Sequence, residues 1–441
     1  MTLQPVHPDA EFATGIENLG PCKIANPTRY RRFTSDDQRV LYDKSASDIT
    51  GKIKAGKTVL SFEEAGPREK IFFEPEATTA AVVTAGGLCP GLNDVTRSIV
   101  HELHFNYGVQ QIKGIRYGYT GLSPISGWPM IDLTPNLVRR IHDDGGTVLG
   151  SSRGPQPVDQ MVDTLEREHI NILFTIGGDG TLRGALAIQK HIARRRLPIA
   201  VVGVPKTIDN DIDLVSRTFG FDTAVGEAVE AIRCAHTEAE GALNGIGMVK
   251  LMGRNSGFVA IEAALAEGDV NFVLVPEVPF DLDGPRGFLA CLEKRLKARH
   301  HAVIVVAEGA GQNLFTDDLG QDASGNRRLG HIGLLLKERI KAHFAGKQIG
   351  VSVKYIDPSY MIRSVPANAN DCVFCVFLGQ NAVHAGMAGK TGLLVGSWHN
   401  MYVHIPIASA IARRKCLDPQ GNLWRSVLEA TGQPESMSLL K

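Results

Sequence analysis

Short β-branched runs alternate with amphipathic stretches along most of the chain after about residue 79. Such alternation is typical of βαβ units, in which helices separate buried parallel strands. Strands are predicted at 80–84, 111–115, 172–176 and 200–204, a long helix near 222–240, and further strands at 247–251, 272–275, 302–306 and 348–353. This order predicts an α/β fold with two Rossmann-like lobes, parallel-rich sheets and a cleft between them.

The domain boundaries follow from where this pattern starts and changes. Residues 1–77 hold scattered prolines and charges without a long period, and we expect an N-terminal extension that embraces the core. The first lobe is predicted over 78–224 and is completed by 362–412. The second lobe is predicted over 225–361 and is completed by 413–441.

Charge balance and the N-terminus narrow the class of protein. Lys plus Arg and Asp plus Glu both total 47, so no global field draws the protein to nucleic acid or to an anionic membrane, and neither is expected as a partner. Residues 1–16 carry no leader pattern and no apolar run is long enough to span a bilayer, which predicts a cytoplasmic protein.

The cysteines carry no clear chemistry of their own. Seven are spread along the chain, most of them in apolar segments such as those around Cys234, Cys372 and Cys375, which favours reduced core thiols. Cys372 and Cys375 form a C-x-x-C pair, but no second ligand pair accompanies it, so core packing is favoured over metal or redox chemistry.

A glycine-rich loop, Thr84-Ala-Gly-Gly-Leu-Cys-Pro-Gly-Leu-Asn93, follows the first predicted strand and precedes an amphipathic stretch. Glycines at this point allow backbone N–H groups to approach an anion at a helix N-terminus. A tight strand-to-helix turn accounts for the loop equally well, because it matches neither the P-loop nor the dinucleotide fingerprint.

A second loop, Gly177-Gly-Asp-Gly-Thr-Leu-Arg-Gly184, follows the third strand and places Asp179 among glycines. A carboxylate with bare backbone beside it suits Mg²⁺ held against a polyphosphate, whereas a structural turn would not require an aspartate. Lipid and NAD kinases also contain Gly-Gly-Asp-Gly in their nucleotide loops.

The most informative stretch is Pro205-Lys-Thr-Ile-Asp-Asn-Asp211, after the fourth strand. Asp209 and Asp211 are two positions apart, so in an extended segment both carboxylates face one way. One can accept a hydroxyl proton while the other helps to position it or the metal, and Lys206 can neutralise phosphate charge. An Asx-rich turn explains Asn210 but leaves these three charges unexplained.

The second lobe carries cations and a carboxylate after its strands. Lys250 lies at the end of one strand and Arg254 just after it, Glu308 follows another strand, and Lys354, Tyr360 and Arg363 lie within ten positions of each other. Each is by itself an ordinary surface residue. Together they offer what a sugar phosphate needs, because cations bind the phosphoryl group and carboxylates bind hydroxyls.

These motifs, with Leu149-Gly-Ser-Ser-Arg153, Met252-Gly-Arg254, Pro276-Glu-Val-Pro-Phe280 and Ala307-Glu-Gly309, occur in an order that resembles the phosphofructokinase family over about residues 79–413. The resemblance implies transfer of a phosphoryl group to the 1-hydroxyl of fructose 6-phosphate, with ATP as donor and Mg²⁺ as cofactor. It also implies that the first lobe binds the donor and the second binds fructose 6-phosphate.

Site residues carried over by this resemblance fall into three groups. Asp209 would be the base, with Thr207, Asp211 and Arg254 beside it, and Asp179 would hold Mg²⁺. Donor contacts are implied for Gly87, Arg153, Asp179, Gly180, Thr181, Gly184 and Lys206. Sugar-phosphate contacts are implied for Thr207, Asp209, Met252, Gly253, Arg254, Glu308, Lys354, Tyr360 and Arg363, with Lys354 reaching the 6-phosphate of a neighbouring subunit. The family further implies an allosteric homotetramer, at least a dimer, although the sequence identifies no effector.

Two positions, Lys206 and Gly245, depart from the better-known ATP-dependent members, and a third, Gly180, departs from the pyrophosphate-dependent ones. Lys206 stands where those enzymes have glycine and is typical of pyrophosphate-dependent members. Gly180 stands where pyrophosphate enzymes usually carry an aspartate, and we expect it to favour ATP because a blocked pocket would exclude the nucleotide sterically. Gly245 stands where many members have an arginine that crosses the subunit interface, so either another cation such as Lys250 replaces it or the sugar-phosphate contact is weaker.

Three other functions stay open at this point. A pyrophosphate-dependent phosphofructokinase shares every motif except the donor markers. A lipid or NAD kinase shares the Gly-Gly-Asp-Gly loop but does not need the cations and Glu308 of the second lobe. A non-catalytic sugar-phosphate sensor is expected to lose the carboxylates, and Asp179, Asp209 and Asp211 are all present.

Overall fold

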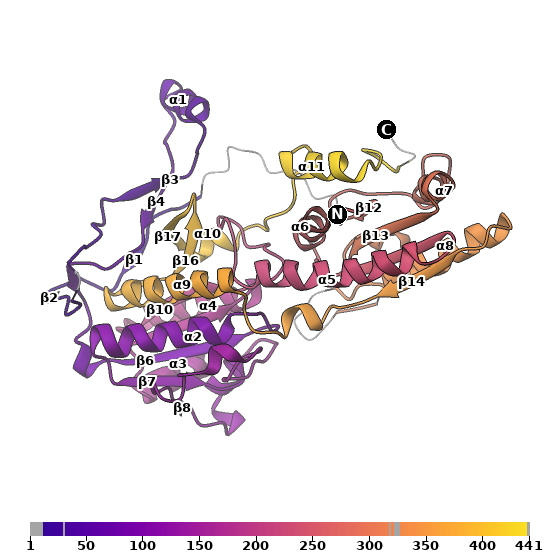
Figure 1. Ribbon diagram of the computed structural model, residues 1–441. Coiled ribbons are helices and arrows are strands. Elements are labelled where there is room, and N and C mark those ends of the chain that lie inside the picture. Colours follow the sequence, from indigo (N-terminus) through magenta and orange to yellow (C-terminus); the bar gives the residue numbers. More distant parts are fainter. Residues whose placement is uncertain (1–11, 30, 317–318, 322–326, 439–441) are drawn as a thin grey trace.

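Two α/β lobes, each built around its own sheet, make up the computed structural model of the protein, which describes residues 12–29, 31–316, 319–321 and 327–438 (Figure 1). Of the predicted N-terminal extension, the structure describes residues from Phe12 onward. Residues 439–441 of the predicted second lobe lie outside the described residues. None of the described helices is long and apolar enough to cross a membrane.

The first lobe contains a nine-stranded sheet in the order β3-β4-β17-β16-β10-β9-β6-β7-β8. The four strands predicted for this lobe form its parallel centre, as β6 (Thr79–Ala85), β7 (Gln111–Ile115), β9 (Ile172–Gly177) and β10 (Ala200–Pro205). The remaining members are β3 (Arg39–Leu41), β4 (Ser61–Glu64), β8 (Ile131–Asp132), β16 (Leu393–Trp398) and β17 (Met401–Pro406). Of these, only β16 pairs with a neighbour in parallel, alongside β10.

Side chains on this sheet alternate between two faces, each covered by helices. Alanine and valine at 80 and 82 face α2 (Leu92–His101) and α9 (Ala369–Met387), whereas those at 81 and 83 face α3 (Val158–Arg167) and α4 (Asp179–Arg195). The register pairs both Ala85 and Pro205 with Gly177. The three loops singled out in the sequence consequently leave the sheet at one edge.

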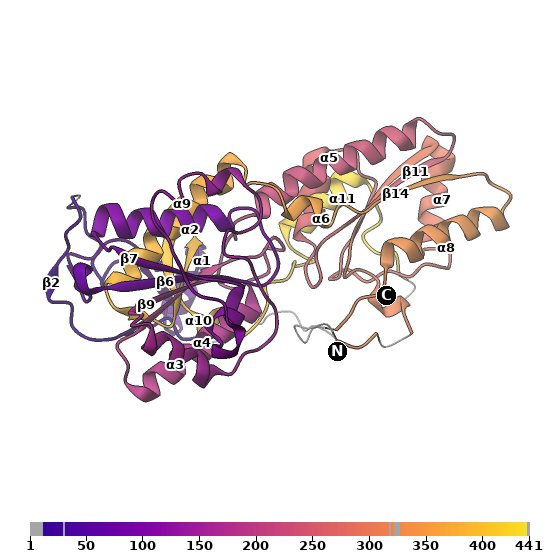
Figure 2. The ribbon, with the colours of Figure 1, turned by 90° about the horizontal axis from the view of Figure 1, so that it is seen from below.

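The second lobe contains a parallel sheet in the order β12-β13-β11-β14. Its strands are β11 (Gly245–Leu251), β12 (Phe272–Leu274), β13 (His301–Ala307) and β14 (Ser352–Ile356). One face is covered by α5 (Phe221–Glu240) and α6 (Phe258–Glu267), and the other by α7 (Phe288–Arg299) and α8 (Ile332–Gly346). Figure 2 shows α5 and α6 on one side of this sheet and α8 on the other. The helix α11 (Asn422–Thr431) packs beside α6.

One predicted strand was misplaced. The apolar residues at 348–353 were expected to form it, but the strand begins only at Ser352. The helix α8 runs on to Gly346, and Gln348 then has a left-handed backbone with φ of 57°. The chain uses these residues to turn, so β14 starts four positions later than predicted.

Residues of the N-terminal segment join the first lobe through short strands. Besides β3 and β4, the pairs β1 (Glu17–Asn18) with β15 (Lys390–Thr391) and β2 (Ile24–Ala25) with β5 (Lys70–Ile71) attach it, and α1 (Ala46–Lys54) projects from the lobe (Figure 1). The Oε1 atom of Glu63 on β4 lies 2.6 Å from a nitrogen of Arg68, 2.8 Å from Nζ of Lys390 and 2.9 Å from Nδ1 of His404. Burial alone would raise the pKa of Glu63, but His404 and Lys390 lower it to about 2.

All seven cysteines are free thiols. Cys375 is buried on α9 and Cys372 is half-buried, but Cys234 is exposed on α5, so the expectation of an apolar setting is wrong for that residue. Burial raises the pKa of Cys375, in agreement with packing rather than reactivity.

Candidate active site

A cleft of about 1840 Å³ lies between the lobes, at the carboxyl ends of both sheets. Most of the predicted site residues line it, namely Gly87, Arg153, Asp179, Gly180, Thr181, Gly184, Lys206, Thr207, Asp209, Asp211, Met252, Arg254, Glu308, Tyr360 and Arg363. Gly253 and Lys354 do not line it. One apolar core continues through both lobes by way of α5, which fixes the two walls relative to each other.

Three cations converge on the first glycine loop. The Nζ of Lys206 donates to the carbonyl of Gly87 at 2.7 Å. A Cβ placed on Gly87 would lie 3.2 Å from a guanidinium nitrogen of Arg153 and 3.3 Å from one of Arg363. Burial lowers the pKa of Lys206, and repulsion from Arg153 and Arg363 acts in the same direction. Positive charge gathered against bare backbone is the arrangement that binds phosphate groups.

The paired carboxylates follow Lys206 in the segment after β10. Thr207 donates through Oγ1 to Asp211 at 3.0 Å and accepts from the backbone N–H of Asp209 at 3.1 Å. The Oδ1 atom of Asp209 is buried and has no hydrogen-bond partner among the described residues. Burial raises the pKa of Asp209 to about 8, with further contributions from the charges of Asp211 and Glu308. A desolvated carboxylate with one oxygen left without a partner is a strong proton acceptor, although a backbone hydrogen bond from Arg254 opposes the rise in pKa.

Asp179 begins α4 and faces the cleft beside two arginines. Its Oδ2 lies 3.1 Å from Nε of Arg183 and 3.5 Å from a nitrogen of Arg414. Arg414 also lies 3.7 Å from Asp211, so it links the candidate metal ligand to the carboxylate pair. The sequence reasoning missed Arg414, which falls just beyond the region of resemblance. The run Arg413-Arg414-Lys415 was the available signal.

Gly180 and Gly184 of the motif at 177–184 both lie on α4, and different features of the structure favour glycine at each position. A Cβ on Gly180 would meet no atom within 4 Å, so any larger side chain there would project into the cleft. A Cβ on Gly184 would lie 2.5 Å from the ring of Tyr119. That ring is buried, and its hydroxyl donates to the carbonyl of Thr181 at 2.7 Å. Gly180 leaves space for a ligand, while Gly184 leaves space for the protein's own core.

The wall formed by the second lobe mixes cations with carboxylates. Lys250 pairs with Asp357 at 2.9 Å, and Arg254 donates to the carbonyl of Arg327 at 2.5 Å. The guanidinium of Arg363 lies 4.8 Å from the ring centre of Tyr360, whose side chain is 73% exposed. Glu308 follows β13 directly and opens toward the same space. Asp357, Arg328 and His331 also line the cleft and were not singled out in the sequence.

Gly253 and Lys354 have other positions. Gly253 has φ of 128°, and its carbonyl accepts the N–H of Gly309 at 3.0 Å, so it forms the turn that presents Arg254. Lys354 lies on the edge strand β14, half-exposed, and pairs with Glu238 of α5 at 3.3 Å. Within the single chain this lysine does not reach the cleft.

Gly245, where an arginine was expected for the family, begins β11 against the last turn of α5. A Cβ there would lie 2.0 Å from the carbonyl oxygen of Ala239 and 2.8 Å from its carbon. Backbone atoms cannot move aside as a side chain can, so this strand start excludes an arginine. Lys250 does line the cleft, as a replacement for that arginine would have to do.

The cleft between the two α/β lobes joins cation-rich glycine loops to a buried carboxylate, one oxygen of which has no partner among the described residues. This arrangement defines a phosphoryl-transfer type of protein. The family model for phosphofructokinase matches residues 79–386. The chain belongs to the phosphofructokinase family.

Curated relatives match nearly the whole chain. One is the ATP-dependent 6-phosphofructokinase of Borreliella burgdorferi, 50% identical over 96% of this chain and 97% of its own length. Another is the ATP-dependent 6-phosphofructokinase of Amycolatopsis methanolica, 48% identical over 95% of this chain and 94% of its own. A third is the ATP-dependent 6-phosphofructokinase of Trypanosoma brucei brucei, 50% identical over 94% of this chain and 86% of its own length.

Solved structures share the fold. The pyrophosphate-dependent phosphofructokinase of Marinobacter aquaeolei matches with a TM-score of 0.67 and 19% identity, over 81% of this chain and 92% of that one. The phosphofructokinase of Pichia pastoris in its T-state matches with a TM-score of 0.62 and 23% identity, over 77% of this chain and 36% of that one.

Proposed function

We propose that this protein is an ATP-dependent 6-phosphofructokinase, which phosphorylates the 1-hydroxyl of fructose 6-phosphate in glycolysis. The observation that carries the proposal is Asp209, a buried carboxylate without a hydrogen-bond partner among the described residues at its Oδ1. Two of the three cations gathered on the first glycine loop, Lys206 and Arg363, interact electrostatically with Asp209. The names of the curated relatives supply the acceptor and the donor.

The first lobe binds the donor in this proposal, and the second binds the sugar phosphate. Gly87, Arg153 and Lys206 hold the donor phosphates, with Gly180, Thr181 and Gly184 on the nucleotide side. Met252, Gly253, Arg254, Glu308, Tyr360 and Arg363 surround fructose 6-phosphate, with Gly253 acting through the turn that it forms. Asp209 accepts the proton of the 1-hydroxyl, while Thr207 and Asp211 hold its segment in place.

Mg²⁺ fits the oxygen atoms that this site offers. Asp179 is a carboxylate on the rim of the cleft, and Mg²⁺ is usually bound by one or two carboxylates together with substrate phosphates. When bound, Mg²⁺ neutralises charge on the donor phosphates. Arg183 and Arg414 hold the carboxylate of Asp179 at the mouth of the donor side.

The choice of donor rests on Gly180 and Lys206. Open space at Gly180 supports a nucleotide, because an aspartate there would enter the cleft with negative charge. Lys206 does not oppose this, because its Nζ is directed at the carbonyl of Gly87 and adds to the charge that binds either donor. All three relatives are named ATP-dependent 6-phosphofructokinase, which also supports ATP over pyrophosphate.

The working enzyme is a homo-oligomer in this proposal, at least a dimer and by family a tetramer. Lys354 lies away from its own cleft on an edge strand, where a neighbouring subunit can receive it. Val373, Val376 and Phe377 form an exposed apolar stripe on α9, a composition that suits a subunit contact. A cytoplasmic location stays a prediction of the sequence.

The test is the initial rate of fructose 1,6-bisphosphate formation from fructose 6-phosphate and Mg²⁺, with ATP or pyrophosphate supplied separately. We expect turnover with ATP. In the Gly180→Asp variant, we expect the rate with ATP to fall by at least tenfold while any rate with pyrophosphate is retained, because one unfavourable contact of about 1.4 kcal/mol is a factor of ten. Gly346→Asp, at an open glycine of α8, is the matched control.

The other outcomes have definite meanings. Turnover with pyrophosphate alone would show that Lys206 outweighs Gly180. No product with either donor would overturn the acceptor assignment.

A further inference from the structure

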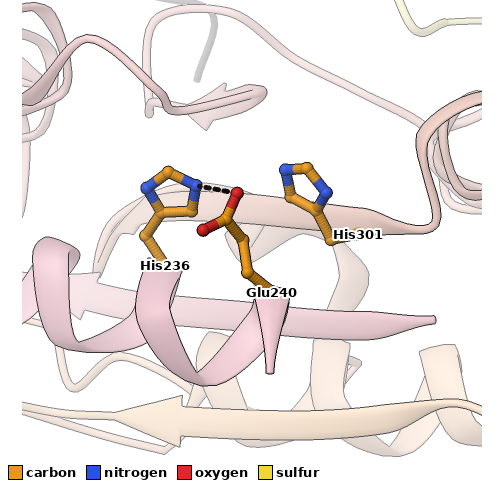
Figure 3. Close-up of side chains that lie close together, drawn as sticks. All are labelled: His236, Glu240 and His301. Atoms are coloured by element: carbon orange, nitrogen blue, oxygen red, sulfur yellow. Dashed lines mark ion pairs between the residues drawn. The ribbon is translucent and has the colours of Figure 1, made fainter. Parts of the chain in front are cut away.

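Two histidines and a glutamate gather at the end of the second lobe that lies away from the cleft. His236 and Glu240 are on the last turns of α5, and His301 is the first residue of β13 (Figure 3). One ligand atom from each lies within 4.8 Å of those of the other two. Because β13 runs from His301 to Ala307 before it reaches the cleft, roughly 20 Å of strand separates the cluster from the active site.

Each imidazole has one ring nitrogen directed at an oxygen acceptor and the other directed into the cluster. The Nδ1 of His301 lies 3.1 Å from the carbonyl oxygen of Arg299, which leaves Nε2 as its open nitrogen. The Nδ1 of His236 lies 3.6 Å from Glu267 and 3.9 Å from Asp269, while its Nε2 lies 3.5 Å from Glu240. Histidines that bind metals typically donate their second N–H to a carboxylate or a carbonyl. His301 has such a partner, whereas the carboxylates beside Nδ1 of His236 lie just beyond hydrogen-bond distance.

One pair of the candidate ligands already has the separation that a bound ion requires, and His301 must approach it from within 4.8 Å. Two ligands about 2.1 Å from a tetrahedral Zn²⁺ lie about 3.4 Å apart. The Nε2 of His236 and the carboxylate of Glu240 already have this separation, at 3.5 Å. Figure 3 shows one ring nitrogen of His301 turned toward the same carboxylate. The half-exposed ring of His301 and the exposed Glu240 give an ion access from solvent.

The local field also favours a cation. The C-terminal ends of α5 and α6 both point here, and each helix end carries partial negative charge. The side chain of Glu267 is 5% exposed, so its charge is little screened by water. Arg295 opposes the attraction, but its Nε donates to the backbone carbonyl of His301 at 3.3 Å, not to the imidazole ring.

We propose that His236, Glu240 and His301 bind a divalent transition-metal ion of the Zn²⁺ class, with Glu267 as the carboxylate that orients His236. Two imidazoles and one carboxylate suit Zn²⁺, Co²⁺ or Ni²⁺, whereas Mg²⁺ and Ca²⁺ prefer oxygen atoms alone. The ion fastens the end of α5 to the start of β13. This site is separate from the catalytic Mg²⁺ and does not depend on the proposed activity.

Binding of Co²⁺ to the chelator-treated, full-length protein tests the proposal, by equilibrium dialysis and by the visible absorption band of the bound ion. We expect one Co²⁺ per chain in the wild type, without substrate or nucleotide. In the His236→Gln and His301→Gln variants this binding should be lost or weakened at least tenfold. His343→Gln is the matched control, because His343 in the same lobe pairs with Glu293 at 3.1 Å but belongs to none of the candidate metal-binding groups in the described part of the chain, and binding should persist.

Glu267→Gln separates a positioning role from a ligand role. The substitution should weaken Co²⁺ binding by about 10- to 100-fold, the range found when outer partners of metal ligands are changed, while the shape of the absorption band is kept. Unchanged binding in both histidine variants, or a thiolate charge-transfer band in the wild type, would overturn the proposed ligands. Thermal unfolding without metal shows whether each variant is folded.

Discussion

Asp209 must be ionised to accept a proton, yet burial raises its pKa to about 8, with Asp211 and Glu308 adding to the effect. A base whose pKa is raised loses activity as the pH falls through that value. We therefore expect kcat/KM for fructose 6-phosphate to decrease tenfold per pH unit on the acid side, with a midpoint several units above 3.8, the ordinary pKa of an aspartate. A pH–rate profile of the free enzyme measures it, and a midpoint below pH 5 would contradict the role given to burial.

The variant Asp209→Asn is the control for that profile. Its turnover should fall by roughly 10²- to 10⁴-fold, the usual contribution of a general base, and the acid limb should disappear. Because the folded-state pKa lies above that of the unfolded chain, ionised Asp209 destabilises the fold as the pH rises. Asn should consequently raise the Tm near pH 8, an effect that a damaged fold would not produce.

Single residues were predictable where their chemistry was carried by spacing within one loop. Asp209 and Asp211 needed only their place after β10, and Asp179 only its place after β9. The extended segment expected to carry the two carboxylates is wrong, because Ile208 and Asp209 form a turn and Asn210 has a left-handed backbone with φ of 52°. Arg414 was missed because its partners Asp179 and Asp211 lie more than two hundred positions earlier in the chain. The convergence of Arg153, Lys206 and Arg363 likewise depends on three segments that only the fold brings together.

Most strands with both faces buried were predictable, although the largely buried β16 was missed. The runs that became β6, β9, β10 and β13 are almost wholly buried, so β-branched composition alone marked them. β17 escaped because it begins exposed and pairs in antiparallel with β16 and β4. The short strands of the N-terminal segment have two to four residues each and show no period.

The start of β11 against α5 depends on Gly245. In Gly245→Ala, the new Cβ would lie 2.0 Å from the carbonyl oxygen of Ala239, and strand or helix must shift. Overpacking of this kind costs about 1–3 kcal/mol of the free energy of unfolding. Thermal or urea unfolding measures the loss.

Gly226→Ala on α5, the helix against which Gly245 packs, provides the matched control. A Cβ at Gly226 meets no atom within 4 Å, and alanine in a helix interior is more stable than glycine by about 0.5–1 kcal/mol. The two variants should move stability in opposite directions. If Gly245→Ala were as stable as the wild type, the close packing of β11 on α5 would not explain the absence of an arginine there.

At the level of the whole molecule, Lys354 is the proposed substrate-binding cation that lies away from the cleft of its own chain. We expect Lys354→Met to raise the KM for fructose 6-phosphate roughly tenfold or more with little change in kcat, because a hydrogen bond to a charged group contributes about 1.5–3 kcal/mol. Lys341→Met on α8, a similarly exposed lysine in a long ion pair with Glu338 at 3.9 Å, should leave the KM unchanged. Initial-rate kinetics give the KM and kcat of both variants, and light scattering establishes the oligomeric size of each protein used.

Mixed oligomers decide whether Lys354 acts in a neighbouring subunit. Lys354→Met chains keep Asp209, and Asp209→Asn chains keep Lys354, so a shared site contains both wild-type side chains only when the lysine crosses the interface. Dissociation and reassembly of the two variants together should then restore activity at the low KM that neither shows alone. If the mixture shows only the sum of the separate rates, the lysine serves its own chain or none, and the cation for the 6-phosphate must be sought within the cleft, where Lys250 already lies.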